Sequence, residues 1–295
     1  MENKTTLLIS TGSRSEEYVK PILRRLENHR SFDVVLFTCL GLSFRASYEL
    51  ACESVPVADY VIIPSDRKEH LPVVIAASEH KIPIIQLYAG DISSGTEDDL
   101  NRYVYSIYAD VICCASMEAF NRVATLFEWL GKDASKIYLT GATHLDDIDI
   151  DESAVPETDY DLILYNPITR GDGTIDRMMR ELWYIREMLN TDTIWLEPCE
   201  DEGRELIIDF ASAHQCPAVL YWNRVPRSIF FGLLKNTKRF ITNSSSACYE
   251  AAEFLEDEQI VQIGERNRVR ERVENRRGGT DRIMQVLEKE CIPHD

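Results

Sequence analysis

The feature that most constrains the fold of this 295-residue chain is a repeated alternation of short β-branched runs with amphipathic segments. Such alternation is typical of parallel sheets covered by helices. In the first half, strands are expected at 6–10, 33–38, 60–64, 83–87, 110–115 and 136–139. After an acidic, proline-containing stretch, strands are expected at 162–165, 193–196, 218–221, 239–242 and 259–263. The acidic stretch, residues 146–161, is therefore predicted to link two α/β units.

Composition narrows the classes of protein to which the chain can belong. A formal net charge of −18 argues against a nucleic-acid partner, because neutralising phosphates needs a basic face. No apolar run approaches the ~20 residues of a membrane span, and the first residues do not resemble a signal peptide, so we expect a cytoplasmic protein without a membrane partner. The eight cysteines form no CxxC pair and the six histidines are scattered, so neither a metal site nor a cofactor is expected.

Polar residues concentrate in the loops that follow the expected strands. In open parallel sheets, ligands bind beyond the carboxyl ends of the strands. Small residues, carboxylates and arginines occur there in the sequences TGSRSEE, PSDRKE, YAGDISSGTEDD, NPITRGDG and NSSSACYE. Each sheet is therefore predicted to present one polar rim to a ligand.

Two segments of the second half suit an anionic ligand. The run Asn243-Ser244-Ser245-Ser246 precedes an expected helix, where hydroxyls, backbone N–H groups and the helix dipole favour an anion. A plain serine N-cap is the structural alternative. The second segment is rich in arginine, although a solvated helix face balanced by glutamates would have the same composition. Its arginines are Arg266, Arg268, Arg270, Arg272, Arg276 and Arg277.

Six ordered segments carry a resemblance to a known family: IPSDR (63–67), AGDISSGTEDDLNRY (89–103), LTGATHLDDI (139–148), LYNPITR (164–170), ITNSSSACYE (241–250) and IGERNRVRERVEN (263–275). In them the chain resembles the hydrolysing UDP-N-acetylglucosamine 2-epimerases, including those of sialic acid synthesis, as a shortened and divergent member. The resemblance implies a GT-B-like α/β fold, with two Rossmann-like doubly wound parallel-sheet domains and an interdomain cleft. It implies an N-terminal domain at 1–150, a nucleotide-binding domain at 151–277, and a helix at 278–295 that returns to the first domain.

The same resemblance implies a UDP-sugar as ligand, a homodimer and a set of site residues. Ser244 and Ser245 would contact the diphosphate and Glu250 the ribose, while Arg266 and Arg270 would line the charged cleft. Arg14 matches an arginine of the first loop. The predicted substrate-binding set is Arg14, Arg67, Asn243, Ser244, Ser245, Ser246, Glu250, Arg266 and Arg270.

The resemblance implies a reaction in two steps: UDP is eliminated from the sugar, and water then adds to the resulting glycal. Both steps need carboxylates on the sugar ring and positive groups on the leaving diphosphate. Asp66, Asp98, Asp99 and Arg102 match the family pattern and are the predicted catalytic residues. The structural alternative is helix decoration, because Asp in a first turn is favourable by roughly 0.3–1 kcal/mol.

Three departures from the family pattern leave other functions open. Tyr88 stands where the family has a glutamate, Asn166 replaces a histidine, and Cys39 lies near the place of another histidine. Asparagine cannot transfer protons, and tyrosine does so only if its pKa moves far from about 10. The chain also lacks residues between Leu40 and Asp59, where we expect a helix and a loop over the sugar to be lost. A GT-B glycosyltransferase and a non-catalytic nucleotide-sugar binder remain alternatives.

Overall fold

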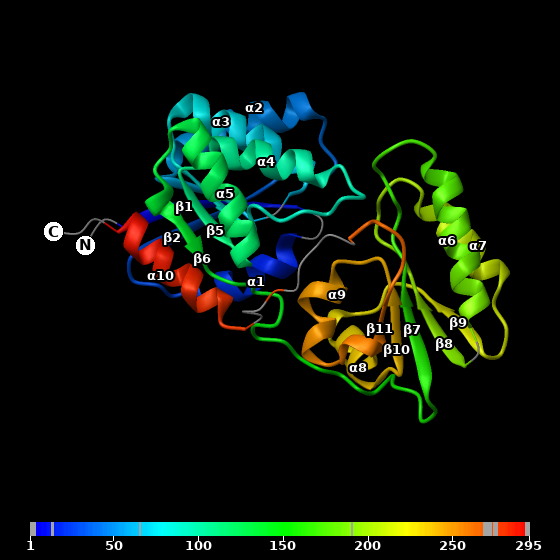
Figure 1. The fold of residues 1–295 in the computed structure, drawn as a ribbon. Helices are drawn as coiled ribbons and strands as arrows, with labels where there is room; N and C mark the ends of the chain where they lie inside the picture. The colour runs from blue at the N-terminus through cyan, green and yellow to red at the C-terminus, as the bar shows by residue number, and fades with distance from the viewer. Residues whose placement is uncertain are drawn as a thin grey trace. The chain divides into compact units, whose positions relative to one another are not determined.

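The computed structural model describes residues 4–12, 15–64, 66–189, 191–267, 273 and 277–292 (Figure 1). The chain divides into two compact units that are not continuous in sequence. Unit 1 comprises Met1–Asp91, Asp98–Asp146 and Val273–Asp295, and unit 2 comprises Ile92–Glu97 and Asp147–Arg272. We propose that these units are the two predicted domains, with the short segment Ile92–Glu97 transferred to the second.

Unit 1 is built on a six-stranded parallel sheet with the strand order β2-β1-β3-β4-β5-β6. The strands alternate in the faces that their side chains bury, as the pleat of a strand requires. Leu8 of β1 packs on one face of the sheet, whereas Leu7 and Ile9 pack on the other. The strands are β1 (Thr5–Thr11), β2 (Phe32–Thr38), β3 (Tyr60–Ile63), β4 (Ile84–Leu87), β5 (Val111–Cys114) and β6 (Ile137–Leu139).

Helices cover both faces of the unit 1 sheet. The helices α1 (Ser15–Leu26) and α10 (Gly279–Cys291) share one apolar core with it, and α10 contacts α1. The opposite core takes α2 (Phe44–Ser54), α3 (Leu71–His80), α4 (Asp98–Tyr108) and α5 (Met117–Leu130). Three short 3₁₀ turns complete the unit: η1 (Val55–Val57), η2 (Lys68–His70) and η3 (Ala134–Lys136).

Unit 2 repeats this arrangement on a five-stranded parallel sheet with the order β11-β10-β7-β8-β9 (Figure 1). Its strands are β7 (Tyr160–Leu164), β8 (Asp192–Leu196), β9 (Val219–Trp222), β10 (Arg239–Thr242) and β11 (Ile260–Gln262). One face packs against α6 (Thr174–Met188) and α7 (Arg204–Ala213). The other packs against α8 (Arg227–Asn236) and residues after α9 (Ser246–Tyr249), where η4 (Ala251–Glu253) and η5 (Asp257–Gln259) follow.

The predicted fold class is confirmed, because both units are parallel sheets with helices on two faces. Each of the predicted strands is present, with ends that differ by at most two residues. The expected loss of a helix between Leu40 and Asp59 is wrong, since α2 occupies this connection and begins with the Ser43 side chain as its N-cap. Within the described residues, no helix is both long and apolar enough to cross a membrane.

Candidate functional site

Predicted catalytic residues of unit 1 meet around the side chain of Arg102 on α4. Its guanidinium donates to Asp99 Oδ1 at 2.6 Å and to the Asp91 carbonyl at 2.8 Å, and it also pairs with Asp66. Arg102 is 2% exposed, so its charge is held by these acceptors rather than by water. The structure therefore brings the end of β3 and the start of α4 into one charged cluster.

The three predicted aspartates differ in their access to solvent. The Asp99 side chain is 8% exposed, which suits a structural partner of Arg102, whereas Asp66 and Asp98 are 25% and 24% exposed. Arg67 Nη1 lies 3.9 Å from Asp98 Oδ1 and thereby joins Asp98 to the cluster. Asp66 and Asp98 are the carboxylates of this rim that remain accessible to a ligand.

Two further residues at this rim were not predicted. Glu69 Oε1 lies 3.8 Å from Arg67 Nε, and its carboxylate packs so closely on Gly12 that a side chain at position 12 would collide with it. His70 is fully buried and its Nδ1 lies 2.8 Å from Ser10 Oγ. Glu69 lies in the polar loop PSDRKE, so the rule on strand exits could have included it. Nothing in the sequence marks His70 as buried.

Tyr88, which replaces the family glutamate, holds the loop after β6. Its hydroxyl lies 2.6 Å from Thr143 Oγ1 and accepts a 2.8 Å hydrogen bond from the Thr143 backbone N–H. Burial of this hydroxyl raises the pKa of Tyr88 far above its ordinary value, although part of the side chain remains accessible. The phenol stays protonated near neutral pH, so it does not replace a carboxylate base. Burial likewise raises the pKa of the Cys39 thiol, which disfavours a reactive thiolate.

Three asparagines tie together the strand exits of unit 2. The Asn166 backbone N–H donates to Asn243 Oδ1 at 2.7 Å, and Asn243 Nδ2 returns a 2.8 Å bond to the Asn166 carbonyl. Asn166 Oδ1 accepts from the Cys199 N–H, while Asn267 Nδ2 donates to the Asn243 carbonyl at 2.7 Å. Asn166, at the position of the family histidine, therefore joins β7, β8 and β10. The hydrogen bond from Asn267 places the end of the described 266–267 segment beside Asn243.

The serine loop after β10 is shaped by its own hydroxyls. Ser244 Oγ lies 3.0 Å from Ser246 Oγ and accepts from the Ser246 N–H at 3.2 Å. Within the described part of the chain, the Ser245 backbone N–H has no acceptor, which leaves this donor available to a ligand. The expected contribution of a helix dipole is small, because α9 spans only four residues. Hydroxyl and backbone donors, rather than a long helix, would carry anion binding here.

Arg266 is anchored inside unit 2. Its Nε donates to the Pro167 carbonyl at 2.8 Å, and its Nη2 lies 3.4 Å from Asp201 Oδ2. The residue is only 8% exposed, and its backbone contacts Gly95. Arg266 thus supports the loops after β7 and β8 as much as it supplies positive charge. Arg14 and Arg270 lie outside the described residues.

Glu250, predicted to bind ribose, ends the short α9 turn and is 4% exposed. Arg227 Nη2 donates to its Oε1 at 2.9 Å.

The described residues contain no group of three or more His, Cys, Asp or Glu that could hold a metal.

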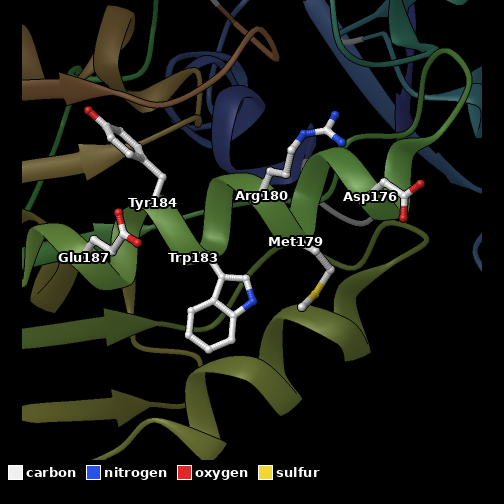
Figure 2. Close-up of a pocket in the computed structure, with 6 residues that line it drawn as sticks. All are labelled: Asp176, Met179, Arg180, Trp183, Tyr184 and Glu187. Carbon is white, nitrogen blue, oxygen red and sulfur yellow. The ribbon is translucent and has the colours of Figure 1, made fainter.

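A shallow hollow of about 450 Å³ lies elsewhere in unit 2, along α6 (Figure 2). It is lined by Asp176, Met179, Arg180, Trp183, Tyr184 and Glu187, none of which is a predicted site residue. Trp183 turns toward α7, where its ring meets Phe210 edge-on at 5.2 Å. All six lining residues belong to α6, so the hollow lies along one face of a single helix.

Two doubly wound parallel-sheet units with polar loops at the strand exits define a GT-B-like α/β protein. The family model for UDP-N-acetylglucosamine 2-epimerase matches residues 51–290, and the chain belongs to this family. The resemblance inferred from the six ordered segments is confirmed.

Two curated relatives are hydrolysing 2-epimerases. The UDP-N,N'-diacetylbacillosamine 2-epimerase (hydrolyzing) of Legionella pneumophila is 28% identical over 229 residues, which is 74% of this chain and 59% of that protein. The GDP/UDP-N,N'-diacetylbacillosamine 2-epimerase (hydrolyzing) of Campylobacter jejuni is 24% identical over 258 residues, 82% of this chain and 65% of that protein. The chain thus spans less than two thirds of the length of either relative.

Solved structures share the fold at lower sequence identity. UDP-GlcNAc 2-epimerase from Neisseria meningitidis, bound to UDP-GlcNAc, superposes with a TM-score of 0.73 at 15% identity, covering 98% of this chain and 100% of that one. A UDP-N-acetylglucosamine 2-epimerase structure from Listeria monocytogenes gives 0.72 at 14% identity, covering 99% and 98%.

Proposed function

We propose that the chain is a hydrolysing UDP-sugar 2-epimerase that acts on UDP-N-acetylglucosamine or a close relative. The observation that carries this proposal is the cluster of Asp66, Asp98, Arg67 and Arg102 at the rim of unit 1. The hydrolysing relatives and the UDP-GlcNAc-bound structure support the reaction type and the ligand class.

In the proposed reaction, Asp98 takes the proton from carbon 2 of the sugar. The bond between carbon 1 and the diphosphate oxygen breaks with its electron pair on the oxygen, so UDP leaves and a glycal forms. The oxygen of water then adds to carbon 1, and a proton returns to carbon 2 on the opposite face. Asp66 is the second carboxylate able to exchange a proton with the sugar ring.

The serine loop is proposed to hold the diphosphate. Hydroxyls of Ser244 to Ser246 and the Ser245 backbone N–H would donate to phosphate oxygens, which gain charge as UDP departs. Asn243 and Arg266 would hold this loop in place through the bonds described above.

Purified protein should convert UDP-N-acetylglucosamine to UDP and N-acetylmannosamine, followed by NMR, with deuterium entering carbon 2 in heavy water. Asp98→Asn should lower kcat about a hundredfold or more and leave UDP affinity nearly unchanged, since general-base catalysis contributes roughly 10²–10⁴-fold. Ser244→Ala should instead weaken UDP binding about fivefold or more, as expected for one lost hydrogen bond.

Other outcomes would redirect the proposal. UDP binding without turnover of UDP-N-acetylglucosamine, UDP-N,N'-diacetylbacillosamine or related UDP-hexosamines would leave a non-catalytic binder. Release of UDP that depends strictly on an added sugar acceptor would indicate a glycosyltransferase. Equal effects of the two substitutions on affinity would contradict the assigned roles. The homodimer and the cytoplasmic location stay predictions.

A further inference from the structure

Arg227 and Glu250 form a partly buried ion pair, and Arg227 lies in none of the sequence motifs. Arg227 is the first residue of α8, and Glu250 directly follows α9. The Arg227 side chain is 27% exposed and that of Glu250 only 6%, with 2.9 Å between Nη2 and Oε1. The carboxylate is therefore almost enclosed, and the arginine is the more exposed partner of the pair.

Two contacts fix the position of this pair. The Arg227 guanidinium lies 4.8 Å from the centre of the Phe231 ring, one helical turn further along α8. The Glu250 backbone N–H donates to the Ser246 carbonyl at 3.0 Å, which ties the backbone of Glu250 to the serine loop. A rigid helix face thus determines the direction of a carboxylate that lies one turn from the proposed diphosphate site.

We propose that Arg227 is a positioning residue for ribose recognition: it holds the Glu250 carboxylate in an orientation that meets the sugar hydroxyls of a nucleoside diphosphate. This inference rests on the proposed function. A carboxylate buried to this extent is costly unless a partner balances its charge. A fixed orientation of the carboxylate lowers the entropy lost when hydroxyls bind.

A purely structural ion pair would have a different consequence. Its removal would loosen unit 2 and weaken all ligands of the site by the same factor. A positioning role instead affects the ligands that carry the ribose hydroxyl and spares those that lack it. The ratio of the Kd for 2′-deoxy-UDP to the Kd for UDP separates the two roles.

Isothermal titration calorimetry with UDP and 2′-deoxy-UDP tests the proposal on the full chain. The wild-type protein should bind UDP about tenfold more tightly than 2′-deoxy-UDP, as a hydrogen bond to a charged group implies. R227Q should reduce this ratio to below about threefold while the Kd for 2′-deoxy-UDP changes less than about threefold. R227K, which keeps the charge, should restore part of the ratio.

Two further variants complete the design. E250Q should abolish the preference for UDP over 2′-deoxy-UDP. The double variant R227Q/E250Q should discriminate between the two ligands no worse than E250Q alone, because both substitutions act on one contact. R224Q is the matched control. This substitution removes the same charge, but from an arginine that pairs with Glu200 in an exposed position. Its ratio should equal that of the wild type.

The proposal is overturned if R227Q and R227K, shown by circular dichroism to be folded, keep the wild-type ratio. It is also overturned if R227Q weakens both ligands equally. Wild-type protein that binds UDP and 2′-deoxy-UDP equally would remove this inference and leave the proposed function intact. Wild-type protein that binds neither ligand would remove both.

Discussion

The aspartates at the rim of unit 1 have similar sequence contexts but different environments. Asp98 and Asp99 are neighbours at the start of α4, yet Asp99 turns inward to Arg102 and Asp98 stays accessible. Neighbouring residues on a helix point about 100° apart, so one can support a buried guanidinium while the other faces a ligand. This difference is the reason for proposing proton transfer by Asp98 and a supporting role for Asp99.

His70 makes protein stability depend on pH. Burial lowers its pKa from 6.5 to about 4, so between these values the unfolded chain binds a proton that the folded chain excludes. The resulting stability is present above pH 6.5 and is lost as pH falls toward 4, by about 3 kcal/mol in total. His70→Gln should therefore show a smaller loss of unfolding free energy than the wild type between pH 7.5 and 4.5.

Urea denaturation at a series of pH values measures this difference. His80→Gln is the control for replacing a histidine, because His80 is exposed at the end of α3. An unchanged slope in His70→Gln would show that His70 is not the group responsible.

Among the elements, α10 shows how a distant segment is attached to a sheet. Its N-terminus carries no side-chain cap of its own, since Gly278 stands at the N-cap position. Asp146, the last residue before the chain leaves unit 1, supplies the cap instead. Its two oxygens accept from the Gly278 and Thr280 N–H groups at 2.6 and 2.7 Å. The helix start and the exit of the chain are thereby joined by one carboxylate.

Asp146→Ala should destabilise the protein by about 1–3 kcal/mol, because two backbone donors lose a charged acceptor. Asp146→Asn should cost less, since one acceptor oxygen remains. Asp149→Ala removes the same charge from an exposed linker position and should change the unfolding free energy by less than about 0.5 kcal/mol. Equal values for Asp146→Ala and Asp149→Ala in urea denaturation would contradict the capping role.

At the scale of the whole molecule, the chain passes between its two units more than once. The segment Ile92–Glu97 belongs to unit 2, although the residues on both sides of it belong to unit 1. Within unit 2, the Gly95 N–H donates to the Arg266 carbonyl, and the Gly95 carbonyl accepts from the Thr169 N–H. A side chain at position 95 would lie 2.4 Å from the Arg266 Cα. Only glycine permits this approach.

Gly95→Ala should cost more than about 2 kcal/mol of stability and weaken UDP binding, because the colliding atom is backbone and cannot rotate away. Gly131→Ala provides the comparison. Gly131 has a φ of +67° but nothing within 4 Å of the added carbon, so only backbone strain of about 1 kcal/mol is expected and UDP affinity should not change. Similar losses of affinity in both variants would contradict the proposed support of Arg266 by Gly95.

Prediction from sequence succeeded where the information is local. The β-branched runs identified each strand, and small polar residues after them located the rims to which Asp66 and Ser244 belong. It failed where a residue's role depends on a partner far along the chain. The burial of His70 against Ser10 and the shortness of α9 have no signature in the residues around them. The α2 helix was missed for another reason: its loss was inferred from the family pattern, although Ser43 marks its start.

The sequence by itself determined the parallel α/β architecture, the family and the residue types at the strand exits, because periodicity and ordered motifs are properties of neighbouring residues. Only the tertiary structure decided which of these residues are held by buried hydrogen bonds and which stay accessible. Tyr88 and Asn166 look like altered catalytic groups in the sequence, yet their hydrogen bonds to Thr143 and Asn243 make them structural. The physical reason is that a polar side chain takes its role from the partner that satisfies it, and that partner is brought close only by folding.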